Sequence, residues 1–119
     1  MLTAEVLAFL QGDPHRIALF EAAQAAISAC GESAMTVQKS QISWGNPLKF
    51  AFLSFRKGDC LILTFGLNER VAHPKIFQAV EPYPGRWTHH VILSSPGDVD
   101  DDVRAWLREA YAFAVAKKR

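Results

Sequence analysis

The alternation of apolar and polar positions predicts helices at both ends of the chain and strands between them. From 17 to 30, apolar residues recur every three or four positions, which is typical of a helix with one buried side. Asp13 and Pro14 stand where a helix usually begins. We expect a shorter helix at 3–10, a last helix after the aspartates at 100–102, and strands at 35–44, 48–56, 60–67 and 86–94.

Short turns at 45–47 and 57–59 separate the first three strands, so these strands must run antiparallel. The sequence therefore predicts an α+β two-layer sandwich, in which N- and C-terminal helices pack on one face of an antiparallel sheet of four to five strands. Residues 1–119 fit a single domain. Three prolines favour an irregular segment at 68–85, with a short helical turn around Phe77.

The first expected strand, 35–44, breaks its own alternation. Its apolar residues have odd numbers as far as Val37 and even numbers from Ile42 onwards. A β-bulge between them would explain the change. Such a bulge would turn Lys39 out of the interior and towards the sheet edge, beside the strand that carries Arg86.

Composition narrows the choice of partners. The formal net charge of 119 residues is only +1, which gives no support for a nucleic-acid partner or an anionic membrane surface. No apolar run is long enough to span a bilayer, and the N-terminus, with Glu5 and no basic region, does not resemble a signal peptide. We therefore expect a cytoplasmic protein in which Cys30 and Cys60 are free thiols.

No known catalytic or metal-binding pattern is present. His89 and His90 are adjacent on a strand and should point to opposite faces, so one metal ion cannot readily bind both. The acidic run that begins at Asp98 resembles a calcium loop but has Val103 where such loops need glycine. We expect no metal, no cofactor and no catalytic residue, and an enzyme would have to use His89 as its general base.

A set of polar and aromatic residues on the expected sheet is the candidate ligand site. Lys39 and Arg86 would supply positive charge, and Trp87 would supply a ring, with Trp44 and Tyr83 as further aromatic walls. The alternative is that Lys39 extends past the sheet edge and that Arg86 pairs with a surface carboxylate, Glu81. The candidate ligand-binding residues are Lys39, Ser40, Arg70, Arg86, Trp87 and His89.

Three segments resemble one known family. They are "VQKSQISW", "AVEPYP" and "PGRWTHHVILSSPGDVDDDVRAWLREAY", which together look like DUF5655, a family of small bacterial domains of unknown function. The likeness covers nearly the whole chain and is strongest from Val80 to Tyr111. It implies a cytosolic bacterial protein, and it implies that Lys39, Ser40, Arg86, Trp87 and His89 belong to a shared site, without indicating an activity.

We expect the domain to bind a small anionic or phosphate-bearing ligand without catalysing a reaction. The alternative is a protein-interaction or dimerisation module that uses the exposed sheet face, because Phe50 and Phe52 would lie on one face of their strand and Phe55 on the other. A third function comes from the element order, which is similar to frataxin-like metal chaperones. Frataxins carry an acidic ridge on the first helix and strand, whereas the first strand here carries Lys39.

Overall fold

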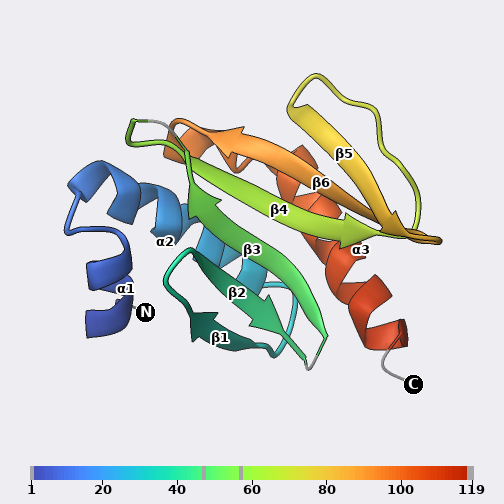
Figure 1. The fold of residues 1–119 in the computed structure, drawn as a ribbon, viewed down its shortest axis with the longest axis horizontal. Helices are drawn as coiled ribbons and strands as arrows, with labels where there is room; N and C mark the ends of the chain where they lie inside the picture. The colour runs from blue at the N-terminus through green and yellow to red at the C-terminus, as the bar shows by residue number, and fades with distance from the viewer. Residues whose placement is uncertain (1, 47, 57, 118–119) are drawn as a thin grey trace.

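The computed structural model contains one six-stranded antiparallel sheet with helices on one side (Figure 1). It describes residues 2–46, 48–56 and 58–117. The strand order across the sheet is β1-β2-β3-β4-β6-β5. In chain order the elements are α1 (Ala4–Phe9), α2 (Pro14–Ser28), β1 (Ala34–Val37), β2 (Gln41–Gly45), β3 (Lys49–Phe55), β4 (Leu61–Leu67), β5 (Ile76–Tyr83), β6 (Arg86–Leu93), a 3-10 turn η1 (Pro96–Asp98) and α3 (Asp101–Lys117).

The two N-terminal helices begin where the sequence predicts. The Thr3 hydroxyl accepts a hydrogen bond from the Val6 amide and caps α1. The Asp13 carboxylate accepts bonds from the first amides of α2, at 2.9 Å from His15 N. Each cap satisfies helix N–H groups that have no partner within the helix.

Two layers enclose the hydrophobic core. In Figure 1, α2 and α3 lie behind the sheet, and α3 packs mainly on β3 and β4. Leu53, Leu63, Phe65 and Leu107 are completely buried between the layers. The predicted α+β sandwich, with N- and C-terminal helices on one face, is therefore confirmed, and the sheet has one strand more than the largest number expected.

The predicted first strand at 35–44 is a hairpin of two strands. Val37 pairs with Ile42, and the Gln38 amide donates to the Gln41 carbonyl, so the chain reverses direction at Lys39. The expected β-bulge is therefore wrong. The apolar residues change parity because paired residues of a hairpin share one face whatever the parity of their numbers.

The irregular segment expected at 68–85 contains strand β5 instead of a helical turn. β5 lies at the edge of the sheet, where a proline removes no hydrogen bond from an inner ladder. Its pairing with β6 shifts register before Gln78 and again between Val80 and Tyr83, the stretch that contains Pro82. The prolines thus interrupt the regularity of the strand without preventing it.

A register shift in β3 places Phe50 in the core. Trp44 pairs with Ala51 and Gly45 pairs with Lys49, so Phe50 has no partner residue on β2. Its ring is 1% exposed and meets Tyr111 of α3 edge-on, with the ring centroids 5.2 Å apart. Phe50 and Phe52 therefore do not share a face as the alternation predicted, because the extra residue rotates the strand.

Parts of the predicted turns, Pro47 and Lys57, lie outside the described residues, as does the Tyr83 side chain. Both cysteines, Cys30 and Cys60, are free and half-buried.

Candidate functional site

The sheet face opposite α2 and α3 carries the candidate site, and Figure 1 shows it towards the viewer. We call it the open face. Since directly paired residues point to the same side, the register defines rows across it. The middle row is Ser43, Phe52, Thr64, His90 and Gln78. On one side of it lie Gln41, Ser54, Ile62 and Ile92, and on the other lie Gly66, Thr88 and Val80.

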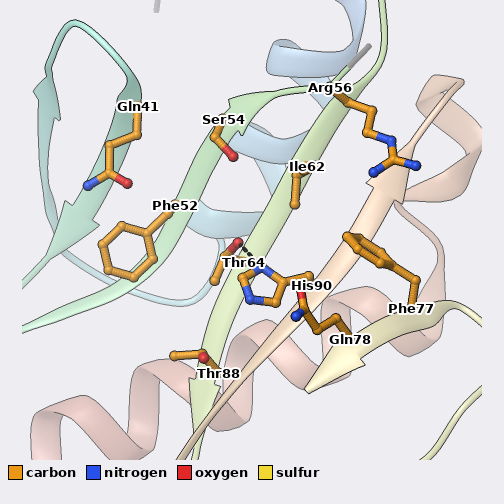
Figure 2. A pocket seen from close by; sticks show the side chains of 10 residues that line it. All are labelled: Gln41, Phe52, Ser54, Arg56, Ile62, Thr64, Phe77, Gln78, Thr88 and His90. Atoms are coloured by element: carbon orange, nitrogen blue, oxygen red, sulfur yellow. Dashed lines mark hydrogen bonds between the residues drawn. The ribbon is translucent and has the colours of Figure 1, made fainter. Parts of the chain in front are cut away.

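The open face is hollowed into a pocket of about 480 Å³. This volume lies within the range of small-molecule sites. Figure 2 shows the pocket, with Ile62 and Thr64 of β4 between side chains of the flanking strands. Its lining consists of Gln41, Phe52, Ser54, Arg56, Ile62, Thr64, Phe77, Gln78, Thr88 and His90.

Arg56 lies at one end of the pocket. Its guanidinium carbon is 5.4 Å from the centroid of the Phe77 ring, which comes from β5 at the sheet edge. Arg56 is exposed, and this cation–π contact, worth about 0.5–1 kcal/mol at such a site, favours that position of the charged group. Among the described residues, no carboxylate forms an ion pair with Arg56.

His90 and Thr64 form the polar centre of the pocket. His90 Nδ1 and Thr64 Oγ1 are 2.9 Å apart, and Phe77 lies beside the imidazole at a centroid distance of 6.0 Å. Burial lowers the pKa of His90 below the usual histidine value of 6.5. The imidazole is therefore largely neutral at pH 7, and it becomes positively charged only in acid.

Arg86 lies beyond the other end of the pocket and crosses β4. It extends over Gly66, and its Nη2 donates to the Lys49 carbonyl on β3 at 3.4 Å. It does not pair with Glu81, whose carboxylate accepts the Gly85 amide in the β5–β6 turn. Lys49 Nζ in turn donates to Ser43 Oγ at 2.7 Å.

Acidic residues are kept away from this face. None lines the pocket, and eleven of the twelve Asp and Glu residues lie on helices or in connecting segments. The exception is Glu81 on β5, whose carboxylate accepts a hydrogen bond from the Gly85 amide in the β5–β6 turn. Arg56, Arg86 and Lys49 therefore give the open face a local positive potential that the net charge of +1 conceals.

The structure does not gather the six predicted ligand-binding residues in one place. Lys39 and Ser40 are exposed at the tip of the β1–β2 hairpin, and Lys39 lines a recess beside α1. Arg86 lies near the opposite end of β2, where Gly45 pairs with Lys49. The convergence of Lys39 with Arg86 is not observed, because the hairpin turn directs Lys39 away from the sheet.

The other predicted residues lie on the helix side or outside the sheet. Arg70 is exposed in the segment between β4 and β5. Trp87 is half-buried and pairs with Leu67 on the helix side. Trp44, expected as an aromatic wall, is 3% exposed and packs on Phe20 of α2. Whether any of them binds a ligand stays a prediction, and none of them lines the pocket on the open face.

His89 lies in the core on the helix side of the sheet and does not line the pocket. It is completely buried and stacks on Phe65, and its Nε2 accepts a hydrogen bond of 2.9 Å from the Val71 amide. The proton of the neutral ring is therefore on Nδ1, which has no hydrogen-bond partner among the described residues. Burial is the largest influence on the pKa of His89 and lowers it.

Sequence reasoning missed Arg56, Phe77 and the Thr64–His90 pair. A signal was present, because Phe52, Ser54 and Arg56 stand at every second position of one strand and Thr64 interrupts the apolar run of the next. Phe77 gave no such signal, since its strand was expected to be irregular.

Neither a metal site nor a membrane-spanning helix is found in the described part of the chain. No three His, Cys, Asp or Glu side chains there are grouped as a metal site. None of the described helices has the length and apolar content needed to cross a lipid bilayer.

The chain is similar to a known protein family. The model of the family described as "Domain of unknown function (DUF5655)" matches residues 8–114. No curated protein and no solved structure matches the chain. The expected likeness to frataxin-like sandwiches is therefore not supported.

Proposed function

The chain belongs to the DUF5655 family, and because the function of that family is unknown, we propose from the geometry of the open face that the domain binds a small anionic ligand there. The observation that carries the proposal is the pocket, which has Arg56 at one end, Arg86 beyond the other and no acidic residue in its lining. A guanidinium without a carboxylate partner favours phosphate or carboxylate ligands.

The geometry of the two arginines supports the same function. Arg56 extends from the end of β3 to Phe77 of β5, and Arg86 extends from β6 over β4 to β3. Each makes one such contact, and most of its N–H donors have no acceptor among the described residues. The proposal keeps Arg86 from the sequence-based set and adds Arg56 and His90. It also keeps the expected cytoplasmic location.

Titration with inorganic phosphate, followed by amide chemical shifts, tests the proposal. We expect saturable shifts at the residues that line the pocket, which Arg56→Gln weakens and Lys39→Ala leaves unchanged. Lys39→Ala is the matched control, because it removes a cation at the far hairpin tip. Shifts that map elsewhere, or that survive both Arg56→Gln and Arg86→Gln, would contradict binding at this pocket.

A second candidate is the interaction module expected from the sequence, now centred on the edge strand β5. Phe77 and Val80 of this strand are 44% and 42% exposed, and one edge of β5 has no neighbouring strand. Phe50 and Phe55 no longer support this function, because Phe50 is buried and Phe55 stacks on Phe9 of α1. Sedimentation at high protein concentration tests it, since a monomer would count against self-association.

A further inference from the structure

We infer that the ligand of the pocket is an anion that carries a flat ring, with its acid group at Arg56 and its ring between Phe52 and His90. This inference rests on the proposed function and adds the ring to it. Aromatic carboxylates and nucleotides share this chemistry, and the experiment below distinguishes them.

Phe52 and His90 stand on either side of Thr64 in the lining of the pocket. Phe52 on β3 and His90 on β6 both pair with Thr64 of β4, so their backbones are two strand spacings apart, about 9.5 Å. Thr64 is short and is hydrogen-bonded to His90, and Figure 2 shows it between Phe52 and the His90 ring. A flat ring above Thr64 would stack against Phe52 or His90, and contacts of this kind are sequence- and substituent-tolerant.

The surroundings of Arg56 favour binding of an acid group. The guanidinium carbon of Arg56 lies over the Phe77 ring, and no hydrogen bond from its N–H groups to another described residue is observed, which leaves these donors for an oxygen acceptor. A planar fork of this kind binds carboxylate or phosphate through two parallel hydrogen bonds. Since Phe77 restrains the side chain, less rotamer entropy is lost when the anion binds.

The remaining lining residues fit a ring with polar substituents. Gln41, Ser54, Gln78 and Thr88 offer both donors and acceptors around the rings. A simple inorganic anion would use Arg56 and leave these groups and both rings without contacts. A wholly apolar ligand would bury the same polar groups without hydrogen bonds, which is costly.

The experiment compares probes of equal charge chemistry with and without a ring. Amide-shift titrations with phenyl phosphate and glycerol phosphate form one pair, and benzoate and acetate form the second. Adenosine monophosphate separates nucleotides from simple aromatic acids. The variants are Phe52→Leu, which removes the ring but keeps an apolar side chain, and Arg56→Gln, with Arg108→Gln on α3 as the control.

We expect the ringed probe of each pair to bind about fivefold to tenfold more tightly than its ring-free partner, the size of one ring contact. Phe52→Leu should remove most of that advantage, Arg56→Gln should weaken both probes, and Arg108→Gln should change neither. Equal affinity within each pair would contradict the inference that the ligand carries a ring, but it would not contradict the proposed anion binding. If no anion gives saturable shifts, both proposals fail together.

Discussion

The guanidinium of Arg86 lies directly on Gly66 of the neighbouring strand. A Cβ atom at Gly66 would come within 2.9 Å of Arg86 Nη2 and 3.1 Å of its Cζ. Glycine is required here for space and not for an unusual backbone angle, since Gly66 is absent from the residues with positive φ. The position of Arg86 thus depends on a missing side chain on another strand.

Gly66→Ala should displace the end of Arg86 at little cost to the fold. The clashing atoms belong to a flexible side chain, so we expect the free energy of unfolding to change by less than about 1 kcal/mol. Phosphate affinity should fall modestly, because Arg86 adds positive charge near the pocket in which Arg56 binds the anion. Denaturant unfolding and phosphate titration measure the two effects. Gly97→Ala is the control, because its nearest side-chain atom is 4.0 Å away, and an unchanged phosphate affinity in Gly66→Ala would exclude Arg86 from binding.

Phe50→Ala and Phe52→Ala should have very different effects on stability. Phe50 is buried against Tyr111, so its truncation should cost about 3–5 kcal/mol. Phe52 is only half-buried on the open face, and its truncation should cost much less. Chemical denaturation of both variants checks this difference. Similar losses would mean that the register shift in β3 does not divide the two rings between the faces.

Asp13→Ala should destabilise the protein by about 1 kcal/mol through loss of the α2 cap. Asp59→Ala removes an exposed carboxylate in the β3–β4 turn and serves as the control. Thermal unfolding compares the two variants. A melting temperature that is equally unaffected in both would show that the cap does not contribute to the stability of the helix.

Stability should fall as the pH drops from about 7 to 5, because burial lowers the pKa of His89 in the folded state. The unfolded chain binds a proton near pH 6.5 and the folded chain only at lower pH, so acid favours unfolding over that interval. Unfolding curves at several pH values measure the slope.

His89→Gln should flatten this pH dependence. His90→Gln should flatten it as well, because burial lowers the pKa of His90 in the same direction. A slope that persists in the double variant would assign the acid sensitivity to other groups.

The sequence predicts the fold where local signals agree with the tertiary contacts. Asp13 and Pro14 define the start of α2, and the apolar periodicity at 17–30 matches the buried side of that helix. The hairpin at Lys39 was missed because no glycine or proline marks the reversal. β5 was missed because its prolines are tolerated only at a sheet edge, and edge position depends on the whole strand order.

The sequence predicts a cationic site on the sheet, but it does not predict which residues come together to form it. Alternation placed His89 and His90 on opposite faces of their strand, and the structure agrees, with His89 in the core and His90 in the pocket. The prediction that Lys39 lies beside Arg86 was wrong. Lys39 lies at the hairpin tip, and the cation at the opposite end of the pocket from Arg86 is Arg56. Which cation lies opposite Arg86 depends on the strand order and on the register shift at Phe50, and no local sequence pattern encodes either of them.

The bond from the Val71 amide to His89 has a consequence for hydrogen exchange. Val71 lies outside any helix or strand, yet its amide proton is held by a completely buried imidazole. That proton should exchange with solvent more slowly than those of its exposed neighbours Arg70 and Ala72, because the segment must first separate from His89. The amide of Val71 would then report the separation of this connecting segment from the buried imidazole.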